Sequence, residues 1–590
     1  MKRLEVPVLI VGGGGAGLSA AVIFSDLDIE YLLVERHSGT SPTPKAHYVN
    51  QRSMENFRQH GVAAAVYDAG APRENMGKVH WMTSLSGSGP LDGVLFHEQD
   101  GLGGGGLIGQ YDRASSAHPT NIPQSRLEPI LARTAQERRA DSILFGHELI
   151  ALTQDDSGVT ALVRDLEGAG DVEIRCQYLV AADAGKTIGP ALHVEMLSPT
   201  GLAMDSVSVT FEADLSRYIH SDTAVMRIIL HPSTIHRIGG LLTMGPTWTR
   251  HSEEWRVGFA LSPEELDGLT EETVSEVIRD YLKIDDPIKI TGIFRWHLET
   301  IVAERFLVGR VILVGDAAHQ HPPGAGLGLN SGIQDVHNIG WKLALVLQGK
   351  AEPSLLETYE IERKPVVTRN AEWGLFSLTN RAKLIAAMGL APGAPEGRNE
   401  AEFAKLMADT QDGASRRAVM REIFKVQRME YAAHDMEMGF YYETGALVED
   451  GSDPPWRDPM GSEYRQTSRP GSRLPHAWLE QAGQMVSTHD LIPMGGLLVL
   501  SDAEGGGAWS SAADTLSSEL GVRLANVRVG PDGDAQDLDG TWATVREVDS
   551  DGVVVVRPDG HVGYRSVSHA GDPLAALRHA ANVILGRTIT

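Results

Sequence analysis

An apolar segment near the start of the chain is followed at once by a run of glycines. Residues 6–11 are continuously apolar, which is typical of a strand buried on both faces. Residues 18–27 favour a helix, and residues 29–34 form a second apolar run that ends at Glu35. With the glycines of 12–17 between them, these segments predict a strand–turn–helix–strand unit with parallel strands.

Alternating and apolar patterns continue along most of the chain. Helices are predicted over 51–59 with Asn50 as its cap, over 126–138 and 271–282, and from Asp335 onward, with helical patterns continuing to about residue 433. The four strands predicted between residues 207 and 261 suggest an antiparallel sheet inserted as a second domain. The predicted strands are 160–165, 172–179, 207–214, 225–230, 238–244, 255–261 and 310–314.

Composition divides the chain into segments. Residues 450–472 hold many Pro and Gly residues without a period, which indicates a linker, and residues 101–106 are glycines and leucine that we expect to be mobile. Strands mixed with helices after the linker predict a small α/β domain. The expected division is 1–76, 121–190 and 301–400 for the first domain, 77–120 for a segment of the second domain with a mobile loop, 191–300 for the rest of the second domain, 401–472 for helices and the linker, and 473–590 for the C-terminal domain.

The overall composition indicates an acidic, folded protein. Of its 590 residues 42% are hydrophobic, and the formal charge of −26 disfavours nucleic acid and anionic membranes as partners. Cys176 is the only cysteine, which excludes an internal disulfide and fits a reducing cytosol, and we expect it to be buried at the start of a strand. No apolar run approaches the roughly 18 residues of a membrane helix, so we expect a cytoplasmic protein.

The glycine turn has the spacing of a dinucleotide site. Gly12, Gly14 and Gly17 form a G-x-G-x-x-G pattern between a strand and a helix, and Glu35 follows at the next strand end. Such glycines let a pyrophosphate reach the backbone, while the acid holds ribose hydroxyls. These residues alone leave NAD and FAD open. The expected nucleotide contacts are Gly12, Gly14, Gly15, Ala16, Gly17, Glu35 and Arg36.

A second segment decides between the two dinucleotides. In RVILVGDAAHQHPPGAGLGLNSGIQD, Asp316 directly follows a strand end and precedes a glycine-rich turn into a helix. With KAHYVNQRSMENFRQHGV, NIPQSRLEPIL, FEADLSRY, LLETYEIERKPV and SRPGSRLPHAWL, the chain resembles the class A FAD-dependent aromatic hydroxylases, in their phenol hydroxylase branch, over nearly its whole length. YLVAADAGKTIG matches a third family motif at Asp183, but Ala184 stands where the family has Gly.

The resemblance implies a tightly held FAD. Arg52 would reach the FAD phosphates and Gln124 the flavin edge, while Lys45 stands where the family more often has Arg near the flavin. Asp316 would bind the ribityl chain. The loop and helix start expected along the flavin ring are Pro323, Gly326, Leu327, Gly328, Leu329 and Asn330.

The implied fold is α/β: a Rossmann-like FAD-binding domain with an inserted antiparallel-sheet substrate domain, and a C-terminal thioredoxin-like α/β domain without redox cysteines. The implied activity is hydroxylation of a phenolic or hydroxy-heteroaromatic ring ortho or para to an existing hydroxyl, through a flavin C4a-hydroperoxide formed with NAD(P)H and O2. A halogenase-like oxidoreductase, whose WxWxIP motif is missing from the chain, and a non-catalytic flavin-binding subunit are the alternatives. The expected partners are a small aromatic substrate and further copies of the chain in a homo-oligomer.

Three residues are candidates for the chemistry. His47 is the candidate general base, because histidine titrates near neutral pH, although a structural histidine in the core has the same pattern. Asn121 stands where relatives carry a carboxylate that assists this histidine. Asp214 is either a strand-end cap or a group in the substrate pocket. His319 and His321 form an H-x-H pair without further ligands nearby, so we expect no metal.

Overall fold

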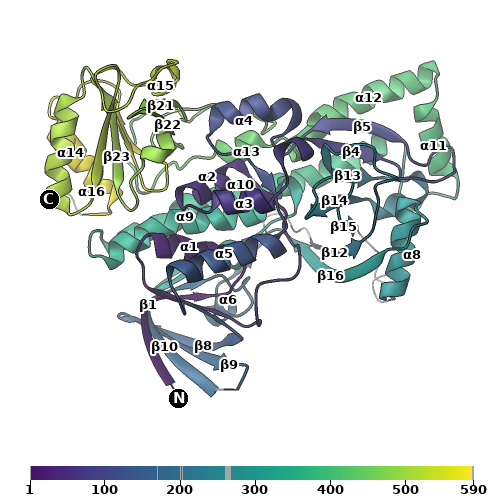
Figure 1. Cartoon of the computed structure of the whole chain (residues 1–590), viewed down its shortest axis with the longest axis horizontal. Coiled ribbons are helices and arrows are strands. Elements are labelled where there is room, and N and C mark those ends of the chain that lie inside the picture. The colour runs from purple at the N-terminus through teal and green to yellow at the C-terminus, as the bar shows by residue number, and fades with distance from the viewer. Residues whose placement is uncertain (1, 169, 199–200, 202, 260–267, 588–590) are drawn as a thin grey trace.

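The computed structural model describes residues 2–168, 170–198, 201, 203–259 and 268–587, and it confirms the predicted α/β fold class. Figure 1 shows a central sheet with helices, a second sheet beside it, and a C-terminal α/β domain on the opposite side. The central sheet has the order β18-β19-β10-β1-β2-β7. Its strands are β1 Lys2–Val11, β2 Tyr31–Glu35, β7 Ile143–Phe145, β10 Gly170–Ala181, β18 Leu307–Val308 and β19 Val311–Leu313, and β9 Gly158–Asp165 and β8 His147–Asp155 extend it beyond β10.

Three parallel strands of this sheet end side by side. Val11 of β1 is paired with Ala181 of β10, and Ala181 is paired with Leu313 of β19. The turns that follow these strands therefore open at the same edge of the sheet, which is where ligands of open α/β sheets bind. Register thus brings together the glycine turn, Asp183 and Asp316, although these residues are far apart in the sequence.

Helices cover the sheet and carry the loops of this edge. Helix α1 contacts both α5 and α9. Helix α9 begins at Leu327, eight residues before the predicted start at Asp335, because the left-handed backbone at Ala325 and Gly326 completes the turn early. The principal helices are α1 Gly15–Asp26, α2 Gln51–Gln59, α5 Gln124–Arg138, α9 Leu327–Leu347 and α10 Thr358–Ala387.

The second sheet has seven strands in the order β16-β12-β15-β14-β13-β4-β5 and is antiparallel except for the β13–β4 pair. Helix α8 Glu271–Leu282 packs on one face through Val274, Ile278 and Tyr281. Residues 260 and 261, the predicted end of a strand, lie outside the described residues. The strands are β4 Lys78–Met82, β5 Leu95–Asp100, β12 Ala203–Glu212, β13 Ala224–Ile229, β14 Gly239–Gly245, β15 Glu254–Phe259 and β16 Lys289–Glu299.

The glycine-rich segment after β5 is packed, which corrects the expectation of a mobile loop. Residues 101–104 are buried, and the Leu102 N–H donates to the Tyr431 carbonyl at 2.6 Å. A Cβ at Gly104 would lie 2.4 Å from the backbone of Gly77. The glycines therefore serve a close approach of two backbone segments rather than flexibility.

The C-terminal domain is a four-stranded sheet with two helices on one face. Its order is β24-β23-β25-β26, with β23 and β24 parallel. Alternate residues of β23 pack to opposite sides, so both faces are covered. Its elements are β21 Trp478–Gln481, β22 Gln484–Ser487, β23 Leu497–Asp502, α14 Gly507–Leu520, β24 Leu524–Val529, α15 Thr541–Val545, β25 Val553–Val556, β26 Val562–Ser566 and α16 Pro573–Ile584. Residues 439–477, all described, contain no helix or strand before it.

Buried ion pairs join this domain to the rest of the chain. Glu362 of α10 accepts hydrogen bonds from Arg557 at 2.7 and 2.9 Å and from Lys342 of α9 at 2.7 Å, and all three side chains are fully buried. Burial by itself would raise the pKa of Glu362, but the two cations outweigh it and lower this pKa to about 2. The carboxylate is therefore ionised and holds Lys342 of its own domain and Arg557 of the C-terminal domain, so the pair with Arg557 crosses the domain boundary.

Ala184, the departure from the family glycine, keeps a glycine-like backbone. Its φ is +58°, in the left-handed region that costs an L-residue roughly 1–2 kcal/mol. Asp183 beside it holds the turn, because its carboxylate accepts the N–H groups of Thr187 at 2.8 Å and Ile188 at 2.9 Å. The turn thus keeps its shape at the expense of strain at Ala184.

Replacing Ala184 with glycine should therefore stabilise the protein. We expect Ala184→Gly to gain about 0.5–1 kcal/mol, because relief of strain exceeds the extra entropy of the unfolded chain. The measurement is the urea midpoint against wild type. Ala64→Gly, at an exposed site in the helix Ala63–Ala69, is the matched control and should lose about 1 kcal/mol. Equal shifts in both variants would contradict strain at Ala184.

Neutralising Glu362 should weaken the attachment of the C-terminal domain. Glu362→Gln leaves Lys342 buried without its carboxylate and leaves Arg557 with Asp559 as its remaining carboxylate partner, which costs about 3–5 kcal/mol. We expect a lower melting temperature and faster proteolysis between residues 439 and 477. Glu519→Gln is the control, because its pair with Arg578 is exposed and is worth at most about 1 kcal/mol. A melting temperature equal to that of the control would show that the buried pairs are dispensable.

Candidate active site

The glycine turn after β1 combines two structural glycines with an open one. A Cβ at Gly12, whose φ is +110°, would lie 2.3 Å from the Ala182 carbonyl oxygen, and a Cβ at Gly17 would lie 1.9 Å from that of Gly12. Gly12 and Gly17 are therefore required by the packing of α1 against the strand ends. At Gly14 the nearest atom to a Cβ is Glu128 Oε1 at 3.8 Å, so the space beside this backbone is free.

Helix α1 presents an uncapped N-terminus to this space. Gly14 is its N-cap and no side chain accepts the N–H groups of the first turn. Such groups, together with the helix dipole, favour an anion such as a pyrophosphate. Gly15 and Ala16 instead face other parts of the protein. A Cβ at Gly15 would lie 2.5 Å from Leu329 Cδ1, and the Cβ of Ala16 lies 3.0 Å from where a Cβ at Gly315 would be.

Glu35 lies at the end of β2 beside the same turn. Its Oε2 accepts the N–H of Gly13 at 2.6 Å and its Oε1 accepts the N–H of His37 at 2.9 Å. Arg36 is exposed. The carboxylate thus stands where an acid can hold ribose hydroxyls next to a pyrophosphate on α1.

Asp316 follows β19 at the same edge and has a free carboxylate. The side chain is exposed, and no hydrogen bond to it is formed within the described part of the chain. Desolvation raises the pKa of Asp316, and the positive charges of His319, Lys45 and Lys186 only partly oppose this rise. Asp335 fixes the preceding turn, since it accepts the Gly315 N–H at 3.1 Å and pairs with Arg363 and His319. This arrangement suits a carboxylate that accepts the hydroxyls of a bound ligand.

The turn into α9 forms a second uncapped helix start. Gly326 is the N-cap with a φ of +62°, and a Cβ at Gly328 would meet nothing within 4 Å. Pro323 is exposed and Leu327 is buried. The buried Asn330 donates to the carbonyls of Tyr48 at 2.9 Å and Gly326 at 2.7 Å. Asn330 therefore shapes this turn, and Gly328 leaves room for a ligand.

Two predicted cofactor residues are engaged with protein groups. The buried Arg52 donates to Glu55 at 2.9 Å and to the Asp559 carbonyl at 2.5 Å, so its contact with FAD phosphates stays a prediction. Gln124 donates to Glu128 at 2.5 Å and accepts the Ala46 N–H at 3.4 Å. Gln124 thus lies at the start of α5 between the glycine turn and the segment of His47.

His47 and Asn121 form a pair between the two sheets. The segment β3 Tyr48–Val49 pairs with β6 Thr120–Asn121, and His47 Nδ1 lies 2.5 Å from Asn121 Oδ1. Because an amide oxygen only accepts, Nδ1 carries the proton and Nε2 is left as a base. Burial and the positive charge of Arg256 lower the pKa of His47 to about 4, against the opposing hydrogen bond of Asn121, so the imidazole is neutral at pH 7.

Asp214 lies in an exposed position after β12. Its Oδ1 accepts the Ser216 N–H at 3.0 Å, a local contact that fits the predicted strand-end cap, and a role in the substrate pocket stays a prediction. Sequence reasoning missed Arg256, which acts on His47 from β15. The sequence does hold one indication of its position. In β15 Arg256 lies between the apolar Trp255 and Val257, so its side chain points to the other face of the sheet.

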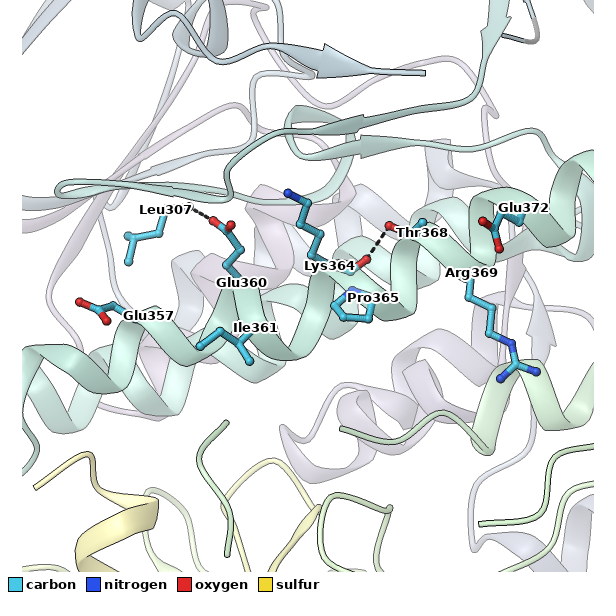
Figure 2. Close-up of a pocket in the computed structure, with 9 residues that line it drawn as sticks. All are labelled: Leu307, Glu357, Glu360, Ile361, Lys364, Pro365, Thr368, Arg369 and Glu372. Carbon is cyan, nitrogen blue, oxygen red and sulfur yellow. Dashed lines mark hydrogen bonds between the residues drawn. The ribbon is translucent and has the colours of Figure 1, made fainter. Parts of the chain in front are cut away.

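A groove on α10 lies away from these residues. It is an open groove of about 930 Å³ along α10, and Figure 2 shows charged side chains of that helix lining it. Glu360 there accepts the Phe306 N–H at 2.7 Å. The groove shares no lining residue with the glycine turn or the His47 pair, so its size carries no argument about the chemistry.

Comparisons with known proteins agree with this site. Residues 5–374 match the family model described as FAD binding domain, and residues 467–588 match aromatic-ring hydroxylase, C-terminal. The chain is 33% identical to 2,4-dichlorophenol 6-monooxygenase of Delftia acidovorans, over 98% of this chain and 99% of that protein. It is 34% identical to phenol 2-monooxygenase of Pseudomonas sp. (strain EST1001), over 97% and 92%. The structure of the flavin-dependent monooxygenase PieE in complex with FAD and substrate matches with a TM-score of 0.91 at 35% identity, covering 99% of this chain and 100% of that chain.

The fold and the open helix N-termini define a flavoprotein with an FAD-binding domain. The chain belongs to the FAD-dependent aromatic-ring hydroxylases, which confirms the predicted family, the FAD cofactor and the co-substrates NAD(P)H and O2. Among the described residues, the helices are too short or too polar to cross a bilayer.

The open space at Gly14 gives a test of the FAD site. Gly14→Ala should fold normally, because the added Cβ has room, but it should weaken FAD binding at least tenfold by occupying the approach to α1. FAD affinity is measured by fluorescence titration of the apoprotein. Gly17→Ala is the contrasting variant and should fail to fold stably, because its Cβ would lie 1.9 Å from the Gly12 oxygen. Wild-type affinity in Gly14→Ala would place the pyrophosphate elsewhere.

Proposed function

We propose that the protein hydroxylates a phenolic or hydroxy-heteroaromatic ring ortho or para to its hydroxyl group. The observation that carries this is a neutral imidazole with a free Nε2 next to the sheet that covers the site. A ring hydroxyl that gives its proton to Nε2 leaves an electron-rich ring, which an electrophilic oxygen attacks at ortho and para carbons. The names of the phenol-hydroxylating relatives support the same substrate class.

FAD, when bound and reduced by NAD(P)H, supplies the activated oxygen. The residues proposed to hold it are the open backbone at Gly14, the acid Glu35, the free carboxylate of Asp316 and the turn around Gly328. His47 takes the proton of the substrate hydroxyl at Nε2, and Asn121 keeps the other ring nitrogen protonated and the ring in place.

The non-catalytic alternative has less support. A flavin-binding subunit has no use for a base whose tautomer is fixed by Asn121. A halogenase lacks its W-x-W-x-I-P motif in this chain. We further propose that the protein is cytoplasmic, with which the single, buried and free Cys176 is compatible, and that it forms a homo-oligomer, as predicted above.

Removing the base should separate hydroxylation from cofactor binding. We expect His47→Gln to lower the rate of product formation about 10²–10⁴-fold while FAD binds as in wild type. Product and NAD(P)H consumption are measured together on a phenol. Continued NAD(P)H oxidation without product is expected, because the ring is no longer activated. A variant that forms product at the wild-type rate would rule out His47 as the base.

The pH dependence tests the Asn121 contact. With the pKa of His47 near 4, kcat/KM should be independent of this group above about pH 5. Asn121→Asp places a carboxylate on Nδ1, favours the protonated ring and should raise this pKa by about 1–3 units. Since only neutral His47 accepts a proton, the acid limb of the profile should move to higher pH by that amount. Asn121→Ser is the uncharged control, and an acid limb at the same pH in both variants would contradict the contact.

A further inference from the structure

A positive charge, that of Arg256, lies on the second sheet and acts on His47. In β15, Trp255, Val257 and Phe259 are buried against the α8 side, so Arg256 points to the opposite face. From that face its charge acts on His47, which belongs to the segment beside the FAD-binding domain. Arg256 is therefore on the side of the sheet that faces the proposed chemistry.

The neighbours of Arg256 are neutral. Its guanidinium donates to Ser208 Oγ at 2.7 Å and lies 5.9 Å from the centre of the Trp296 ring. No carboxylate pairs with it among the residues that the structure describes, and burial lowers its pKa to about 10.

Arginines inside the chain meet their charge in two ways. Arg363, Arg473 and Arg557 are fully buried, and each pairs with a carboxylate. Within the described residues Arg227 of β13, which is also buried, donates only to neutral oxygens, as the half-buried Arg256 does. A cation withdrawn from water without a counter-charge is unfavourable, and an anion that enters the site relieves that cost. Ser208 and Trp296 hold the guanidinium in place, and among the described residues its one hydrogen bond, to Ser208, uses one of its five N–H groups.

We propose that Arg256 binds the oxygen of the substrate's ring hydroxyl as a phenolate, so that the enzyme favours phenols acidic enough to ionise in the site. The inference rests on the proposed function. One proton moves from the hydroxyl to His47 Nε2, and the electron pair left on the oxygen faces the guanidinium. The negative phenolate also offsets the positive charge of Arg256, which otherwise disfavours a protonated His47. Arg256 and His47 therefore act on the same oxygen.

The test uses 4-nitrophenol, whose phenolate is yellow, with the FAD-loaded enzyme and no reductant. The pKa of the bound probe is read from its absorbance over a pH series, and its affinity from the same titrations. In wild type we expect the pKa of the bound probe to be at least one unit below that of the free probe, as for a group near an opposite charge.

Variants separate the guanidinium from general charge effects. Arg256→Met should remove the shift and weaken phenolate binding about 10–100-fold, and Arg256→Lys should restore part of both. Arg250→Met is the control. Arg250 is exposed on the turn before β15, so this substitution removes the same charge from outside the site. FAD content and melting temperature verify that each variant is folded.

The outcomes distinguish this inference from the proposed function. If 4-nitrophenol fails to bind, binds with an unshifted pKa, or shifts equally in Arg256→Met, the inference is wrong, even where phenols still stimulate NAD(P)H oxidation and are hydroxylated. If no phenol is hydroxylated by wild type but the shift is present and depends on Arg256, the proposed function fails while the anion site stands.

Discussion

The close approach of α1 to the end of β1 is the constraint on which the site depends. Gly17 sits so near the Gly12 carbonyl that no side chain is possible at either position. This contact directs the first N–H groups of α1 toward the edge where β10 and β19 also end. The parallel register then sets the separation between the open turn and Asp316. A cofactor that spans both points is selected by backbone geometry before any side chain contributes.

The C-terminal domain reinforces the same site from outside. It has no cysteine, so it cannot carry out thiol chemistry. Its Arg473 pairs with Glu55, and the carbonyl of Asp559 accepts from Arg52, both on α2. Helix α2 begins directly after the strand that follows His47, with Asn50 as its cap. Buried charge pairs therefore connect the last domain to the segment that holds the proposed base, which gives this domain a supporting role.

Local patterns were sufficient for the elements but not for the contacts between them. The apolar runs located β1, β2 and β19, and the cap at Asn50 located α2, because these depend on neighbours in sequence. The start of α9 was missed because a left-handed Ala325 is invisible in composition. The glycines of 101–106 looked mobile because the partner that explains them, Gly77, is distant in sequence. Pairings such as Arg52 with Asp559 are likewise set only by the tertiary fold.

Charge balance explains why one arginine could not be recognised from the sequence. Arginines are frequent in this chain, and most of the deeply buried ones meet carboxylates contributed by other elements. Only the assembled sheet shows that Arg256 meets Ser208 and Trp296 instead. The same charge lowers the pKa of His47 and keeps it neutral, so the base is ready to accept a proton. A site that is cationic before its substrate arrives therefore favours the ionised form of a phenol, which is also the form whose ring reacts best with an electrophile.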